Sequence, residues 1–585
     1  MKKENKRMRT SRTATTCLFT AIALCCSLAT PTRADVIGRV SNIVPSTIQV
    51  SPQGDRVLVV SVNPQTKKRQ VYLNGKALPG VYDAIAGGTP FFSEDGKHHV
   101  FVATRGEQCM VVLDGVEQTP YAITKAGWPI AGLVFGSDAT KTHLAYQASK
   151  DGRHYVVVNG KVLGHYDSVI VKDKPAQRGI WDFLFAGDYF AYRAKVGEKM
   201  VACRGRIQGT DITLVTSKPY DSIGSGSPVR MGGKTDATDS DLFAFVAKEG
   251  SGKESIRLLP GDEPISNKTW KYIAPGTLRA SPAQPGEMVY VGGDTHWNVV
   301  VGEKQWPGCG RLGRLMASPS GATWACMAKT DDKLVMMVNG VPGKVYTQIQ
   351  YGDTMFPAGD ERVIYGASII DGSKTPARIV VAGKEGKAYT QVKGDSVVFS
   401  SDKKAMAYVA GDGNKNFVVL DGVEGTHFDE IYDLRFSPVG SRLVYGARRG
   451  LEHFVVEGER EHGPYENIQP GSLVFRPDGK DLAWAAFGSD GNWHVCVNGK
   501  TIDSGCDRVI SQITFSAGVS VPAYVGQYLT DGKPAFALSF GGKIGRAYDA
   551  IWMGDGGKLF VQENGSIKYF AKSGSLLYRN SAEVK

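Results

Sequence analysis

The sequence lacks the features of a disordered or membrane-spanning protein. Charged residues make up only 22% of its 585 residues and hydrophobic residues 42%, so the chain can bury large cores and is too apolar to be disordered. After the first 34 residues no apolar run is long enough to cross a bilayer, and no strongly amphipathic helix stands out. The length by itself suggests more than one domain.

Familiar catalytic motifs are also missing. We find no serine-hydrolase elbow, no phosphate-binding loop and no His-Glu-x-x-His, and the ten histidines are scattered. Residues 308–313, GCGRLG, match a dinucleotide fingerprint, but Trp306-Pro307 precedes them and no helix pattern follows, so the context required of that motif is absent. The carboxylates of residues 235–241 lack the Gly and distal Glu of a calcium loop. We therefore expect no cofactor and no metal.

The first 34 residues have the pattern of a secretory signal. Basic residues come first, an apolar stretch runs from about Cys17 to Ala29, and Thr32-Arg33-Ala34 is a small-x-small cleavage site. We expect cleavage after Ala34 and a soluble periplasmic or secreted protein. Cys25-Cys26 would permit a lipid anchor, but Leu24 is a poor residue to precede a lipidated cysteine, so a lipoprotein is not expected.

The net charge of +11 overstates how basic the mature protein is. Seven basic residues and one acidic residue lie in the first 34, which leaves +5 on the remainder. A charge this small on a long chain does not indicate a nucleic-acid partner.

Cysteines are few, nine in the whole chain, and three of them belong to the leader. Export permits disulfides without requiring them. Cys496 and Cys506 lie in the two arms of one expected hairpin, and Cys309 and Cys326 lie in successive repeats. These are the two candidate pairs, and buried free thiols are the alternative.

A repeat of four short strands is the main feature that the chain does contain. In residues 417–447, FVVLDGVEGTHFDEIYDLRFSPVGSRLVYGA, Asp421-Gly422 predicts a hairpin turn and Ser437-Pro438-Val439-Gly440 a second turn, each between β-branched or aromatic runs. Copies recur at roughly 40-residue spacing, the period of a propeller blade. An aromatic residue followed two positions later by Ala or Gly, as in Tyr445/Ala447, predicts core packing between wedge-shaped sheets.

About thirteen such repeats can be counted. Rings usually hold four to eight blades, so we expect an all-β protein of tandem β-propellers with four-stranded blades, in two rings of six and seven. The orphan strand at residues 38–43 is expected to close the first ring near Arg311 to Leu315. The expected domains are a signal peptide (1–34), a first propeller (35–313) and a second propeller (314–585).

Aromatic-acidic dipeptides recur where one repeat leads into the next. We expect them to cap the fourth strand and to bond loop backbone. They are Tyr82-Asp83, Tyr166-Asp167, Tyr220-Asp221, Phe428-Asp429, Tyr465-Glu466 and Tyr548-Asp549.

Three repeats carry the clearest family signature. Phe436-Ser437-Pro438, Phe475 to Lys480 and Phe92 to Lys97 resemble the Ser-Pro-Asp-Gly-Lys class of WD-repeat-like propeller repeats, known from TolB-type proteins and from prolyl oligopeptidase-type peptidases. The resemblance covers nearly all of the chain after the leader and implies the fold. It implies neither activity, because the sequence has no room for the α/β domain of TolB and lacks the peptidases' hydrolase domain.

Two functions follow from such a fold, which does not decide between them. The first is a noncatalytic exported binding or scaffold protein that recognises a protein, a peptide or an envelope polymer. The alternative is a propeller enzyme, resembling a glycoside hydrolase or lyase, that acts in a central channel. Two channel carboxylates within about 5–10 Å would favour the enzyme, whereas an apolar or sealed channel would favour the scaffold.

The candidate binding residues are aromatic residues that interrupt the repeat. They lie in the connection between repeats or at a first strand, where a propeller has its channel mouth, and aromatic residues are frequent in binding hot spots. The alternative is that each packs on a neighbouring blade. The candidates are Trp128, Trp181, Tyr351, Tyr432 and Trp552.

Overall fold

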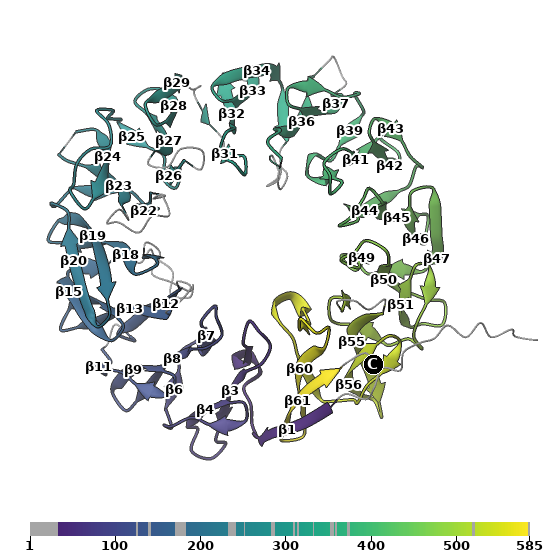
Figure 1. The fold of residues 1–585 in the computed structure, drawn as a ribbon, viewed down its shortest axis with the longest axis horizontal. Helices are drawn as coiled ribbons and strands as arrows, with labels where there is room; N and C mark the ends of the chain where they lie inside the picture. Colours follow the sequence, from purple (N-terminus) through teal and green to yellow (C-terminus); the bar gives the residue numbers. More distant parts are fainter. Residues whose placement is uncertain are drawn as a thin grey trace, which may run out of the picture.

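The protein forms a ring of antiparallel β-sheets. The computed structural model describes residues 33–124, 127–137, 142–169, 183–231, 242–250, 252–281, 287–307, 311–312, 315–330, 333–350, 356, 360–370, 375–516 and 521–582. Thirteen sheets follow one another around this ring (Figure 1). The predicted all-β propeller with about thirteen four-stranded repeats is therefore confirmed.

The first seven blades take the chain halfway around the ring. Blade one has β2 (Gln49–Val50), β3 (Val57–Val62), β4 (Arg69–Leu73) and β5 (Lys76–Ala77). Blade two has β6 (Ala84–Ile85), β7 (Phe91–Phe92), β8 (His99–Arg105), β9 (Gln108–Leu113), β10 (Val116–Glu117) and β11 (Tyr121–Ala122). Blade three has β12 (Ile130–Ser137), β13 (Thr142–Lys150), β14 (Arg153–Val158) and β15 (Lys161–Tyr166). Blade four has β16 (Ser168–Val169), β17 (Leu184–Ala186), β18 (Tyr189–Val196), β19 (Lys199–Gln208) and β20 (Asp211–Thr216); blade five has β21 (Ser222–Ile223), β22 (Val229–Arg230), β23 (Phe243–Lys248) and β24 (Glu254–Leu259). Blade six has β25 (Tyr272–Ile273), β26 (Arg279–Ala280), β27 (Met288–Gly293), β28 (Trp297–Val301) and β29 (Lys304–Pro307); blade seven has β30 (Arg311–Leu312), β31 (Met316–Ala317), β32 (Trp324–Thr330), β33 (Lys333–Val338) and β34 (Val341–Tyr346).

The remaining six blades complete the ring. Blade eight has β35 (Gln348–Gln350), β36 (Ile364–Ser368), β37 (Ala377–Val381) and β38 (Lys384–Glu385); blade nine has β39 (Gln391–Val392), β40 (Val398–Phe399), β41 (Met406–Gly411), β42 (Asn416–Leu420) and β43 (Val423–Glu424); blade ten has β44 (Glu430–Phe436), β45 (Leu443–Arg449), β46 (Glu452–Glu457) and β47 (Arg460–Tyr465). Blade eleven has β48 (Asn467–Ile468), β49 (Val474–Phe475), β50 (Leu482–Phe487), β51 (Trp493–Val497) and β52 (Lys500–Thr501); blade twelve has β53 (Arg508–Val509), β54 (Thr514–Phe515), β55 (Pro522–Thr530), β56 (Lys533–Phe540) and β57 (Lys543–Ile544); blade thirteen has β58 (Ala550–Trp552), β59 (Phe560–Val561), β60 (Ile567–Ser573), β61 (Leu576–Ala582) and β1 (Arg33–Arg39).

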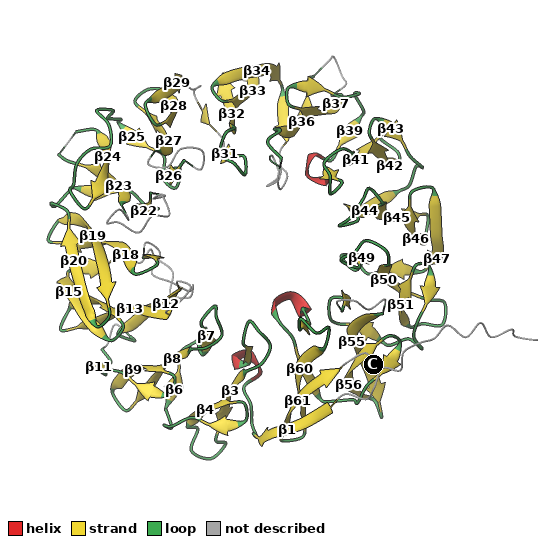
Figure 2. Cartoon of the chain, viewed as in Figure 1, coloured by secondary structure: helices red, strands yellow, loops and turns green. Residues whose placement is uncertain are grey.

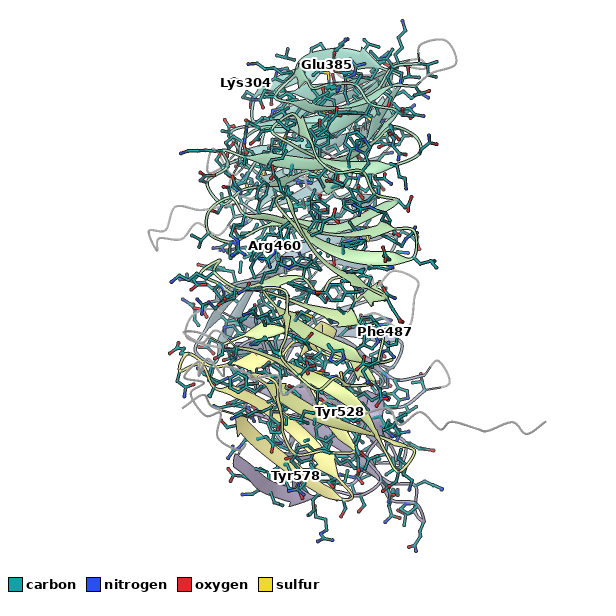
Figure 3. All side chains as sticks on the ribbon, turned by 90° about the vertical axis from the view of Figure 1, so that its right-hand side faces the viewer. Lys304, Glu385, Arg460, Phe487, Tyr528 and Tyr578 are labelled. Carbon is teal, nitrogen blue, oxygen red and sulfur yellow. The ribbon has the colours of Figure 1, made fainter. Side chains whose placement is uncertain are left out.

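The early strands of each blade lie toward the centre of the ring, and the last strand lies toward the rim. Figure 1 shows β7, β31 and β49 on the inner side and β15, β34 and β47 on the outer side. Three short 3-10 turns, η1 (Pro45–Thr47), η2 (Gly394–Ser396) and η3 (Asp555–Gly557), lie in the inner part of their blades (Figure 2). In the side view of Figure 3, the outer strands face the viewer, with Arg460 of β47 and Tyr578 of β61 labelled.

The ring is closed by strands from opposite ends of the chain. The N-terminal strand β1 pairs antiparallel with β61, with Val36 opposite Tyr578, and so becomes the outermost strand of blade thirteen. The closure expected near Arg311 to Leu315 is wrong, because β30 pairs with β32 inside blade seven. Joining β1 to β61 covers two exposed strand edges at once, which is the most effective use of an unpaired strand. A division into separate rings at 313/314 is not seen in Figure 1.

The core lies between neighbouring blades. Phe101, Tyr192, Trp484 and Tyr524, which stand at the repeated aromatic position, have no exposed surface. Their small partners let the next sheet approach; in blade ten, for example, Ala447 is completely buried in a cluster that contains residues of blade nine. Burying an aromatic side chain of this size stabilises a fold by about 1.5–3 kcal/mol. The prediction that these aromatic residues form the core is confirmed.

The aromatic-acidic dipeptides connect consecutive blades. The backbone of Tyr548 pairs with Phe536 of blade twelve, while the carboxylate of Asp549 accepts a hydrogen bond from Gly574 of blade thirteen at 2.7 Å. The same carboxylate bond to the next blade occurs at Asp83, Asp167, Asp221 and Asp429, with Gly106, Gly197, Gly250 and Gly450 as donors. The expectation that these acidic residues bond loop backbone is confirmed at these five junctions.

Candidate functional site

The described candidate aromatics lie far apart in the ring. Trp128 precedes β12 and is 39% exposed, whereas Tyr432 lies on β44 and Trp552 on β58. β12 and β44 are on opposite sides of the ring (Figure 1). Trp181 and Tyr351 fall outside the described residues. The structure therefore does not bring the described aromatics together into one site.

Trp552 mainly packs in the seam that closes the ring. It pairs with Phe570 in blade thirteen and is partly buried against a cluster that includes Val57 and Val59 of blade one. Trp552 therefore fits the alternative considered from the sequence, in which the aromatic residue packs on a neighbouring blade.

Tyr432 lies at a distortion of its strand. β44 bulges between Tyr432 and Arg435, and Asp433 inside the bulge has a φ of 54°. Bulges redirect side chains, and non-glycine residues with positive φ are often associated with function. Blade eleven holds the bulge in place, because the Asp433 carboxylate accepts a hydrogen bond from Gly471 and Arg435 donates to the Leu473 carbonyl at 2.6 Å.

The Tyr432 ring packs against Gly446 of its own blade, and its hydroxyl stays protonated. A Cβ added at Gly446 would come within 2.1 Å of Tyr432 Cε2, so the glycine makes room for the ring. The hydroxyl lies 3.1 Å from Nδ1 of His453. Burial, together with the nearby charge of Asp433, raises the pKa of Tyr432, so this phenol is a neutral donor or acceptor at physiological pH.

A pocket of about 290 Å³ opens beside Tyr432, between blades nine and ten. Lys393, Asp395 and Ser396 line it from blade nine, and Tyr432 and Asp433 line it from blade ten. The lining thus combines Tyr432 with one cation and two carboxylates, while the ring of Tyr432 packs against the cluster between blades ten and eleven.

Of these residues the sequence reasoning identified only Tyr432. A signal for Asp433 existed in the repeat itself, because Gly132 occupies the equivalent position in β12, has a φ of 64° and lies in a similar bulge between Ala131 and Val134. A Gly and an Asp at one repeat position are typical of a left-handed backbone conformation. Lys393 and Asp395 belong to the neighbouring repeat, and only the packing of blades brings them to Tyr432.

The pKa shifts of the carboxyl groups in the described residues all have one direction. Within the described residues, each carboxyl whose pKa departs from its ordinary value has a lowered pKa. The Arg362 guanidinium, for example, lowers the pKa of Asp360. A glycosidase acid requires the opposite, a carboxyl whose pKa is raised so that it stays protonated.

The described thiols are buried in the core. Cys496 packs with Trp484 on one face of blade eleven, and Cys506 packs with Tyr524 on the other face. Both are free and this pair is not formed, because their side chains point to opposite sides of the sheet. Burial raises the pKa of Cys506 to about 12. Cys326 is buried, but Cys309 lies outside the described residues, so the second pair stays a prediction.

Metal and membrane features can be stated only for the described part of the chain. No group of three His, Cys, Asp or Glu residues there could hold a metal ion. No helix among the described residues is long and apolar enough to cross a membrane.

Comparisons with known proteins find only remote structural similarity. No protein-family model and no curated protein matches the chain. Similar solved structures include TolB from Acinetobacter baumannii, with 10% identity, a TM-score of 0.19 and coverage of 59% of this chain and 80% of that one. Another is a eukaryotic initiation factor, with 9% identity, a TM-score of 0.24 and coverage of 77% and 97%.

A third is a TolB-type protein from Agrobacterium tumefaciens, with 14% identity, a TM-score of 0.18 and coverage of 34% and 82%. Scores this low carry no argument about function, and the assignment of the fold rests on the sheet topology. The chain is a β-propeller of thirteen blades, with TolB-type propellers among the structures that it resembles.

Proposed function

We propose that the protein is a noncatalytic exported binding protein that recognises a protein, a peptide or an envelope polymer. The observation that carries this proposal is the pocket between blades nine and ten, where the bulged strand β44 brings Tyr432 and Asp433 to a lining that also holds Lys393 and Asp395. Aromatic residues next to paired charges are typical of binding hot spots.

Binding is favoured over hydrolysis by the electrostatics of the carboxyl groups. Those with shifted pKa values in the described ranges are held ionised by cations, histidines and backbone amides, as at Asp360 and Asp412. Carboxylates in this state can accept hydrogen bonds and pair with cations, but they cannot donate a proton to a leaving group at neutral pH.

Export belongs to the same proposal. The basic and apolar leader ending at Ala34 would send the protein to the periplasm or the medium, and the net charge of +5 on the remainder gives no reason to expect nucleic acid as a partner. Mass spectrometry of the exported protein should give the mass of a chain that begins at Asp35. A retained leader, or a diacylglyceryl mass on Cys25 or Cys26, would contradict export by this route.

Site-specific photocrosslinking tests the binding site. A photoreactive amino acid at position 432 should crosslink one envelope component, which mass spectrometry identifies. The matched control places it at Ala131, the equivalent position in the bulge of β12. Equal crosslinking at both positions, or none at 432 in a protein with an unchanged melting curve, would contradict the proposal. Release of reducing ends from envelope glycan by the purified protein would instead support the enzyme alternative.

A further inference from the structure

A second and larger pocket lies near the outer part of the ring, between blades eight and nine. It has a volume of about 740 Å³ and is lined by the connection that contains Lys387 and Tyr389, by Asp412 in the hairpin between β41 and β42, and by Glu424 and His427. This volume is in the range of pockets that bind small ligands.

Tyr389 at this pocket departs from its repeat. The equivalent tyrosines Tyr82 and Tyr346 each donate a hydrogen bond of 2.9 Å to a glutamate on the outer strand of the next blade. Glu424 is the equivalent glutamate for Tyr389. Its Oε1 accepts a hydrogen bond of 2.5 Å from the ammonium group of Lys387 instead.

The hydroxyl of Tyr389 consequently makes no hydrogen bond of normal geometry, although Glu424 and Tyr408 lie close enough to raise its pKa further beyond the effect of burial. The residue is 8% exposed, and its buried oxygen makes no hydrogen bond to any described residue. A buried polar atom without a partner is costly and requires an explanation, for which a bound ligand is one candidate.

The rim of the pocket presents ionised carboxylates. Oδ1 of Asp412 accepts hydrogen bonds of 2.9 Å from the backbone amides of Asn414 and Lys415. These bonds lower the pKa of Asp412. Its other oxygen, Oδ2, lies 3.8 Å from Nε2 of His427, which is beyond hydrogen-bond distance. Lys387 lowers the pKa of Glu424. The two carboxylates therefore face one lysine and one histidine.

We infer that this pocket binds an arginine side chain of a peptide or protein partner. A guanidinium has five donors and no acceptor, so it suits a pocket whose lining offers Asp412 Oδ2, the Glu424 carboxylate and the oxygen of Tyr389 as acceptors. Charge-assisted bonds of this kind are stronger than neutral ones. The pocket is larger than one side chain and leaves room for the neighbouring residues. The inference rests on the proposed binding function and narrows its partner to a basic peptide segment.

Saturation-transfer difference NMR on the complete exported chain tests this inference. The probe is acetyl-Gly-Arg-Gly-amide, and its matched control is the citrulline analogue, which has the same shape without the charge. We expect saturation transfer to the arginine peptide and at least tenfold weaker binding of the citrulline peptide. Asp412→Asn should weaken arginine binding at least tenfold, and Tyr389→Phe about threefold.

A second pocket supplies a control variant. Glu249 stands at the position of Asp412 in a smaller pocket of about 290 Å³, where Tyr220 does donate to Asp262, at 2.5 Å. Glu249→Gln should leave arginine binding unchanged. Equal binding of the two peptides, no binding at millimolar concentration, or equal effects of Asp412→Asn and Glu249→Gln would overturn the inference.

The other outcomes separate this inference from the proposed function. A chito-oligosaccharide that binds, and that Tyr389→Phe or Asp412→Asn releases, would show a glycan site here and refute the arginine site. If photocrosslinking at 432 finds a partner while the arginine peptide does not bind, the inference fails and the proposed function stands. If the arginine peptide binds and position 432 gives no crosslink, the arginine pocket stands and the binding site beside Tyr432 fails.

Discussion

Asp549 accepts a hydrogen bond from the backbone amide of Gly574 at 2.7 Å, and this contact anchors the connection from blade twelve to the hairpin of blade thirteen. Asp549→Ala should therefore speed amide exchange in the hairpin between β60 and β61 about tenfold, because a hydrogen bond to a charged acceptor is lost. Asp549→Asn, which retains an acceptor oxygen, should have a smaller effect. Hydrogen-exchange mass spectrometry measures both. Unchanged exchange in the alanine variant would show that the bond does not hold the hairpin.

Closure of the ring can be tested by a disulfide. Asp35 and Arg579 are opposite each other in the pairing of β1 with β61, so the variant Asp35→Cys/Arg579→Cys should form a crosslink under mild oxidation. Asp35→Cys/Arg311→Cys, which tests the closure expected from the sequence, should not. Peptide mapping without reduction distinguishes them. A crosslink only in the second variant would restore the model of two rings.

Two tyrosines at consecutive junctions should differ in their contribution to stability. Tyr346→Phe removes the hydrogen bond to Glu385 and should lower the free energy of unfolding by about 1.5 kcal/mol. Tyr389→Phe removes a hydroxyl that bonds nothing in the described structure and should be neutral or slightly stabilising. Denaturant unfolding of both variants decides this point. Equal losses would mean that Tyr389 has a partner in solution.

The stability contributed by Asp360 should depend on pH. Arg362 bonds this buried carboxylate at 2.6 Å and lowers its pKa from 3.8. A group whose pKa is lower in the folded state stabilises the fold above the unfolded pKa, and this contribution is lost as the pH falls through the folded value. The difference in stability between the wild type and Asp360→Asn should therefore be constant near pH 7 and shrink below about pH 4. A pH-independent difference would contradict this linkage, and the exposed Asp531→Asn serves as the control.

Gly446 should be coupled to Tyr432. Gly446→Ala would place a methyl group against Tyr432 Cε2 and should destabilise the protein by about 1–3 kcal/mol through overpacking. In the background of Tyr432→Ala, which removes the ring, the same change should cost much less. A double-mutant cycle measured by denaturant unfolding gives the coupling. Additive effects would show that the ring already lies away from Gly446.

Much of the local structure could be predicted from the sequence because each repeat contains its own turn signals. Asp421-Gly422 predicts a hairpin, and Asp421 has a positive φ of 49°, as such a turn requires. Buried aromatic residues such as Trp484 could be predicted because an aromatic and a small residue two positions apart share one face of a strand. The recurring acidic residues that bond the next blade were visible as well, because one junction repeats the chemistry of another.

The residues of the candidate sites could be predicted only in part. Tyr432 was identified because it interrupts the repeat, but Lys393 and Asp395 belong to the preceding repeat and reach it only when blades nine and ten pack. Tyr389 looks in the sequence like every other junction tyrosine. Its lack of a partner depends on where the Lys387 ammonium lies, which no pattern of spacing contains.

The sequence by itself determined the strand period, the turns, the core positions and the number of blades, because these depend on contacts between residues that are close along the chain. The tertiary structure decided how the ring closes, since the pairing of Val36 with Tyr578 joins strands from opposite ends of the chain. An unpaired edge can be covered by any complementary edge, and only the curvature accumulated over thirteen blades brings β61 to β1. The same long-range geometry determined which charged side chains share a pocket with Tyr432 and with Tyr389.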